Sequence, residues 1–161
     1  MAESNPSLTK ALRDAARRLS NGARYEWGHM ARCNCGHLIQ CLTGMNDREI
    51  SRTVNHHLEE WTEHASTFCP ETGRAVDEVF RELEKVGFHR EDVIHLENLT
   101  DQRVLDRLGD NVHLRRNSPE DVVRYLEALA DLLEEDASAP PARKPRPTRR
   151  KAPLESVLTE A

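Results

Sequence analysis

The sequence has few aromatic residues and no long apolar run. Phe, Trp and Tyr together make up 4% of the 161 residues, whereas charged residues make up 32%. Strands of sandwiches and barrels need aromatic and β-branched side chains, so this composition argues against an all-β fold and favours helices with long solvated faces. Because the apolar runs are only a few residues long, the sequence predicts no membrane-spanning segment and no membrane partner.

A secretory signal is also absent from the first residues. MAESNPSLTK is polar and acidic, where an export signal needs a basic patch followed by an apolar stretch. We therefore expect a cytoplasmic protein, and structural disulfides are rare in that compartment. The four cysteines are accordingly interpreted as thiols: Cys33, Cys35, Cys41 and Cys69.

Apolar residues recur at helical spacing over most of the first 136 residues. The spacing and the glycine and proline stops predict helices over about 7–20, 34–44, from about 47 to 64, 74–86, twice within 90–108 with a break near Thr100, and over 118–136. Ser118-Pro119-Glu120-Asp121 is the best local signal, because it combines an N-cap serine, proline at the first helical position and a carboxylate three residues after the cap.

The remaining segments predict a linker and a tail. Residues 21–33 lack a sustained period and contain two glycines, which indicates an irregular connector. Residues 137–161 are rich in proline and hold six basic residues against Glu155 and Glu160, so this part carries +4 and residues 1–136 carry −9. The prediction is an all-α fold, a single compact domain of six or seven short to medium helices over residues 1–136, followed by a Pro-rich basic disordered tail.

Thiols and imidazoles are concentrated in one region. All four cysteines and five of the eight histidines lie between residues 29 and 69. Thiolate sulfur and imidazole nitrogen are the usual protein ligands of zinc and of several other transition metals. The concentration therefore predicts a small metal-binding protein, with zinc or iron as the metal ion.

The spacing suggests how such a site would be assembled. Cys33 and Cys35 flank the start of a helix predicted to open at Asn34, an N-cap type of residue, and His37 follows one turn after Cys33. On the next helix His57, Glu60 and His64 share one face, and a Cys-Pro turn comes after it. The expected ligands are Cys33, Cys35 and Cys69, with His37 or His64 as the fourth. Four ligands would make zinc structural, whereas three would leave a position for water or substrate.

A second hypothesis is a thiol enzyme centred on Cys35. A cysteine in the first helical turn has its thiolate stabilised by free backbone N–H groups, which lowers the thiol pKa. The stretch NCGHLIQCLTG resembles the nucleophile helix of papain-like enzymes such as bacteriocin-leader peptidases and phytochelatin synthases. The resemblance implies Cys35 as nucleophile, with its own N–H in an oxyanion hole, and His57 or His64 would then be its catalytic partner. Those enzymes carry the partner histidine on a β-sheet lobe, and residues 74–136 show a helical pattern instead.

Three further interpretations complete the sequence-based predictions. Glu26-x-x-His29 resembles the Glu-x-x-His half-motif of ferritin-like di-iron bundles, although a second copy is missing. Cys41 lies on an apolar face and is expected in the core rather than in a site. A third hypothesis for the function is a helical interaction domain that binds an unidentified protein partner and carries no reactive site. In each case the basic tail is expected either to contact an acidic partner or nucleic acid non-specifically, or to lie on the acidic helices.

Overall fold

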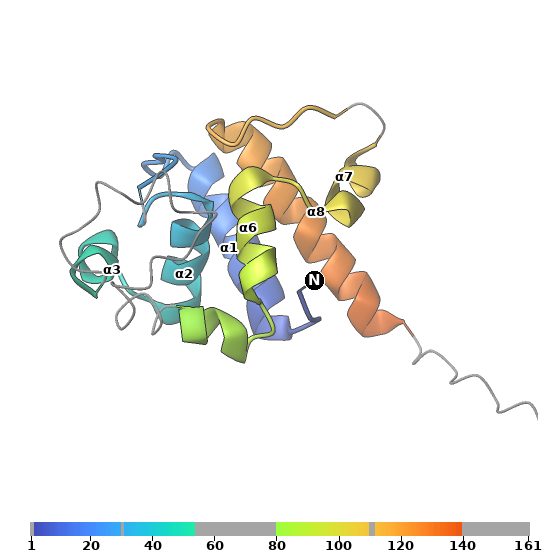
Figure 1. Ribbon diagram of the computed structural model, residues 1–161, viewed down its shortest axis with the longest axis horizontal. Helices are drawn as coiled ribbons and strands as arrows, with labels where there is room; N and C mark the ends of the chain where they lie inside the picture. The colour runs from blue at the N-terminus through green and yellow to red at the C-terminus, as the bar shows by residue number, and fades with distance from the viewer. Residues whose placement is uncertain (1, 30, 54–79, 110–111, 140–161) are drawn as a thin grey trace, which may run out of the picture.

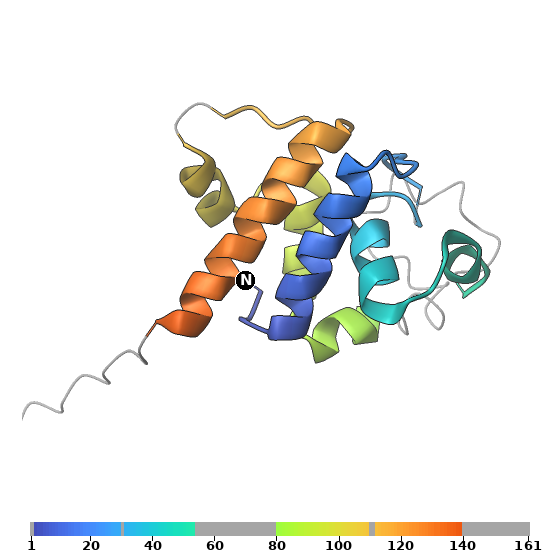
Figure 2. The ribbon, with the colours of Figure 1, turned by 180° about the vertical axis from the view of Figure 1, so that it is seen from behind.

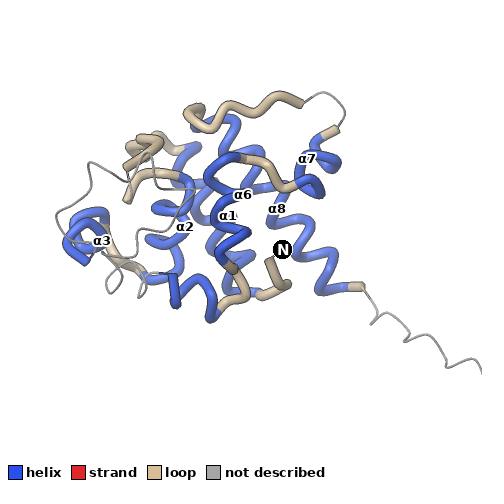
Figure 3. The backbone as a smooth tube through the Cα atoms, viewed as in Figure 1, coloured by secondary structure: helices blue, strands red, loops and turns tan. Residues whose placement is uncertain are grey.

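The helical prediction is confirmed by a computed structural model, which describes residues 2–29, 31–53, 80–109 and 112–139. Within these ranges the backbone forms helices, turns and loops and no strand (Figure 3). Residues 80–85 are helical as well. The labelled helices are α1 (Pro6–Ser20), α2 (Asn34–Thr43), α3 (Asp47–Thr53), α6 (Arg90–Asn98), α7 (Gln102–Leu108) and α8 (Pro119–Ser138).

The core forms where α1 meets α8. α1 packs along α8, α2 packs on the other side of α1 and also contacts α6, and α7 lies against α8 (Figures 1 and 2). Leucines and small alanines alternate on the inner face of α1, as the periodicity predicts, and bulky side chains of α8 pack against them. The buried residues of the two helices include Leu8, Leu12, Ala15, Ala16, Leu19, Val122, Leu126, Leu129 and Leu133.

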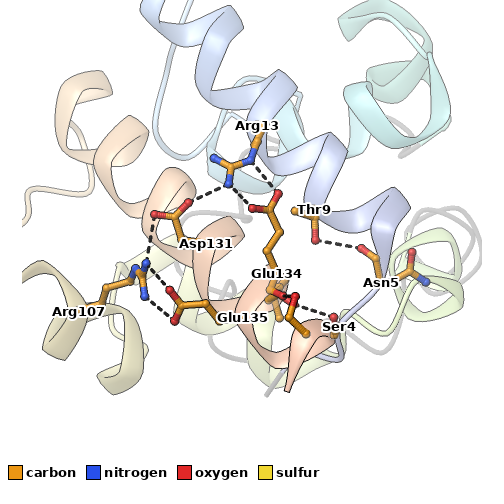
Figure 4. Close-up of polar contacts among 10 residues, drawn as sticks. Ser4, Asn5, Thr9, Arg13, Arg107, Asp131, Glu134 and Glu135 are labelled. Atoms are coloured by element: carbon orange, nitrogen blue, oxygen red, sulfur yellow. Dashed lines mark hydrogen bonds and ion pairs between the residues drawn. The ribbon is translucent and has the colours of Figure 1, made fainter. Parts of the chain in front are cut away.

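Ion pairs follow the outer edge of this helix packing. Arg13 of α1 contacts Asp131 at 2.8 Å and Glu134 at 2.7 Å, and Arg107 of α7 contacts Asp131 at 3.5 Å and Glu135 at 2.8 Å (Figure 4). The last turn of α8 holds no basic residue of its own. Because a helix C-terminus carries partial negative charge, the two arginines compensate for acidic side chains in an unfavourable position.

The helix starts follow local sequence signals. Ser118 caps α8 by accepting a hydrogen bond from the Asp121 N–H, and Pro119 occupies the first helical position, as predicted. Asn5 caps α1 in the same way, so α1 begins at Pro6, one residue before the predicted start. α8 continues to Ser138 and thus enters the segment predicted as tail. The break within 90–108 lies at residues 99–101, where Leu99 has a φ of 55°.

Residues 21–29 and 31–33 form turns and extended backbone, which confirms the predicted connector. Gln40 fixes it to α2 by donating to the Ala31 carbonyl oxygen at 2.6 Å, and Arg32 fixes it to α3 through Asp47 at 3.0 Å. Met30 lies outside the described residues, as do residues 54–79 and 140–161. None of the helices described combines the length and apolar character that crossing a membrane requires.

Candidate functional site at the start of α2

Cys33 is the N-cap residue of α2. Its Sγ accepts a hydrogen bond from the Gly36 N–H at 3.4 Å, and its backbone is extended. The sequence suggests Asn34 as the N-cap, because asparagine is a preferred cap residue. The structure differs, since Asn34 is the first helical residue and its side chain has another partner. The Cys33 thiol is only 3% exposed.

The Asn34 side chain is completely buried between three segments. Its amide nitrogen donates to the Leu96 carbonyl oxygen at 2.9 Å and to that of Glu97 at 3.3 Å. Its amide oxygen accepts from the Tyr25 hydroxyl at 2.7 Å, and this hydroxyl also contacts the Arg116 carbonyl oxygen. The last carbonyl groups of a helix have no partner within the helix, so Asn34 fixes the end of α6 to the start of α2.

Glu97 lies directly against the two thiols. Its Oε1 accepts a hydrogen bond from the Cys35 N–H at 2.7 Å, and its carboxylate also interacts with the thiols of Cys33 and Cys35. The Cys35 thiol is 6% exposed and lies 3.9 Å from the Val93 carbonyl oxygen. The start of α2 and the last turn of α6 therefore bring two thiols and one carboxylate together.

Both thiols are held in their protonated form. Burial raises the pKa of Cys33 and of Cys35 well above the usual value, and the negative charge of Glu97 raises both further. The sequence predicts a lowered pKa for Cys35 from the helix N-terminus. The structure directs those N–H groups elsewhere, because the Cys35 N–H donates to Glu97 and the Gly36 N–H to Cys33. Cys35 faces a carbonyl oxygen instead, which favours a thiol over a thiolate.

Glu97 is the residue that sequence reasoning missed. It stands in REDVIHLEN, an acidic stretch that reads as a solvated helix surface. A signal was present, because Glu97 comes four residues after Val93 and one after Leu96, both of which are buried. Burial raises the pKa of the Glu97 carboxyl, and hydrogen bonds from the Cys33 thiol and the Cys35 N–H act in the opposite direction.

His37 occupies the next turn of α2 and contacts Arg24 and Tyr25 of the connector. Its Nε2 lies 3.2 Å from the Arg24 carbonyl oxygen, and its ring stacks on Tyr25 with centroids 6.3 Å apart. The side chain is 2% exposed, and its Nδ1 has no hydrogen-bond partner in the described part of the chain. Burial lowers the pKa of His37, and the charge of Arg18 lowers it further, so the ring is kept neutral.

Two other sequence-based interpretations have clear outcomes. Cys41 is partly buried against the edge of the core, as expected, and its Sγ lies 3.8 Å from an Arg18 nitrogen. The Glu26-x-x-His29 half-motif lies on turns rather than on the long helix that a di-iron bundle needs. Glu26 is paired with Arg32 at 3.3 Å, and the His29 Nδ1 accepts from the Ala31 N–H at 3.3 Å.

The described residues contain only part of the ligand set predicted from the sequence. Cys33, Cys35 and His37 are close in α2, whereas His57, Glu60, His64 and Cys69 lie outside the described residues. Among the residues that are described, no group of three or more His, Cys, Asp and Glu side chains could hold a metal ion by itself. A complete site would therefore need at least one ligand from residues 54–79.

The different exposure of the cysteines predicts their reactivity. With a chelator present at pH 8, Cys33 and Cys35 are expected to react with iodoacetamide at least about tenfold more slowly than Cys41, because buried protonated thiols are poor nucleophiles. Peptide mass mapping after timed quenching measures the three rates. In denaturant the difference should disappear. Rapid alkylation of Cys35 near pH 7 would contradict this prediction and support the thiol-enzyme hypothesis.

Comparison of the chain with protein-family models, with curated proteins and with solved structures found no match in any of the three. The fold and the arrangement around Cys33, Cys35 and Glu97 are therefore the basis for a functional proposal.

Proposed function

We propose that this protein binds a transition-metal ion, zinc or iron, with the thiolates of Cys33 and Cys35 as two of its ligands. The remaining ligands come from Cys69 together with His37 or His64, and the bound ion connects α2 to the segment 54–79. The observation that carries the proposal is the convergence of two buried thiols and the Glu97 carboxylate at the start of α2.

The chemistry of Cys33, Cys35 and Glu97 supports the binding of a cation. Three groups that become negative on losing a proton lie together with little contact with water. The charge of Glu97 raises the pKa of both thiols, and Cys33 raises the pKa of Cys35 further. A bound divalent ion reverses that situation, because it displaces the thiol protons and compensates the negative charge. In the described residues no Lys, Arg or His side chain forms an ion pair with Glu97 that could compensate this negative charge instead.

The same observations count against an activated thiol. A nucleophilic cysteine needs a lowered pKa, an adjacent base and access for a substrate. Cys35 has a raised pKa and is buried, and the ring nitrogen of His37 points to the Arg24 carbonyl oxygen. The oxyanion hole implied by the papain-like resemblance would use the Cys35 N–H, which is occupied by Glu97.

Elemental analysis of the full-length protein tests the proposal. The protein is prepared without a metal-affinity tag, and its thiols are counted first to establish that they are reduced. The expected result is about one zinc or iron atom per chain, as in other mononuclear sites built from cysteine and histidine. Metal far below one atom per chain, with reduced thiols and after addition of zinc and of ferrous iron, would overturn it.

A further inference from the structure

Glu97 is held in place at its backbone carbonyl group and at its side-chain carboxylate. The backbone carbonyl oxygen of Glu97 accepts hydrogen bonds from Trp27 Nε1 and from Asn34 Nδ2, each at 3.3 Å. The carboxylate end accepts from the Cys35 N–H at 2.7 Å. Trp27 is itself covered by the Arg116 guanidinium, whose central carbon lies 3.9 Å from the ring centroid. The negative charge of Glu97 therefore has a fixed position beside the thiol pair.

The nearby guanidinium does not compensate this charge. Arg116 stacks on Trp27 and donates to the Asn98 side-chain oxygen at 3.0 Å rather than to Glu97. Within the described ranges, the Glu97 carboxylate contacts the Cys35 N–H and the thiols of Cys33 and Cys35. A partly buried carboxylate that lacks a cation is unfavourable, so its presence beside two possible metal ligands calls for an explanation.

Counting charges shows which ion the arrangement fits. Among the described groups, two thiolates and one carboxylate carry three negative charges, of which a divalent ion leaves one and a monovalent ion leaves two. A further thiolate from Cys69 adds one charge in both cases and does not change the difference. Each additional uncompensated charge in a poorly solvated place is unfavourable. Thiolates alone suit copper(I) as well as zinc, whereas carboxylates suit harder, more highly charged ions.

We propose that Glu97 is a positioning and selectivity residue that makes this site prefer a divalent ion such as zinc over copper(I). The inference rests on the proposed metal-binding function. Glu97 acts through its charge and through its hydrogen bond to the Cys35 N–H, and the thiolates remain the ligands. Without the carboxylate, the pair Cys33-x-Cys35 has no feature in the described structure that discriminates between the two ions.

A competition experiment on the full-length reduced protein tests this role. Affinities for Zn²⁺ and for Cu⁺ are measured with chromophoric chelators, for the wild type and for Glu97→Gln. The expected result is a loss of zinc affinity of about 10-fold to 100-fold, the usual effect of removing an outer-shell partner, with copper(I) affinity unchanged or increased. Glu97→Asp keeps the charge and should retain most of the preference. Glu127→Gln changes an exposed glutamate of α8 and should change neither affinity.

The outcomes separate the two proposals. An equal loss for both ions in Glu97→Gln would mean a structural role only, and unchanged affinities would mean no role, so either result would overturn the selectivity inference while metal binding stands. If the wild-type protein binds neither ion, the proposed function itself fails. A changed ratio of the two affinities is a readout that a general loss of stability does not produce.

Discussion

Replacing Cys33 and Cys35 together with serine is expected to abolish stoichiometric metal binding. Serine hydroxyls are much poorer ligands than thiolates for zinc and iron, so the affinity should fall by roughly 100-fold or more, beyond the loss typical of outer-shell changes. The metal content of the purified variant and a chelator titration measure this loss. The two thiols lie at one helix start, and removing both leaves the described part of the site without a sulfur ligand.

The fold should tolerate this double substitution. Cys33 caps α2 through its Sγ, and serine is a stronger cap residue than cysteine, so the helix keeps an acceptor for the Gly36 N–H. Cys41→Ser is the matched control, because Cys41 packs at the core edge beside Arg18 and should leave the metal content unchanged. Wild-type metal content in the double variant, with unchanged circular dichroism, would place the site elsewhere.

Replacing Asn34 with alanine is expected to lower the free energy of unfolding by about 3 kcal/mol, because it removes a buried side chain that satisfies several polar groups at once. The Leu96 carbonyl oxygen loses the hydrogen bond from the Asn34 amide, and the Tyr25 hydroxyl loses one of its two contacts. Urea denaturation, with both proteins in the same metal state, gives the difference.

Asn21→Ala is the control for this substitution. Asn21 is exposed at the end of α1, where only its backbone N–H takes part in the cap, so its change should stay within about 0.5 kcal/mol. If Asn34→Ala also lost less than about 1 kcal/mol, the amide would not be the connection between α2 and α6 that its contacts indicate.

Local rules predicted much of the fold. Ser118-Pro119 marks the start of α8, and the periodic apolar positions of α1 are the buried ones, because capping and amphipathicity depend on residues a few positions apart. Boundaries were less accurate. The sequence placed the end of the last helix at 136 because alanine and serine there precede a proline-rich stretch, and α8 includes two more residues.

The candidate site was predicted less completely, since it depends on contacts between distant segments. Cys33 and Cys35 could be selected by residue type, but their partner Glu97 is more than 60 positions away along the chain. The assignment of Asn34 as a cap failed for the same reason. The Asn34 amide binds the carbonyl oxygens of Leu96 and Glu97 at the end of α6 instead of capping a neighbouring N–H of its own helix. No local sequence pattern reveals this.

The pairing of α1 with α8 has a consequence for synthesis of the chain. Ser4 donates to the Leu133 carbonyl oxygen at 2.7 Å, and Arg13 contacts residues 131 and 134, so α1 is completed by a helix that is synthesised much later. While a ribosome is still translating the segment between them, the leucine face of α1 has no α8 to cover it. Folding of this core must therefore wait until α8 has left the exit tunnel, and until then the nascent chain exposes a surface that chaperones recognise.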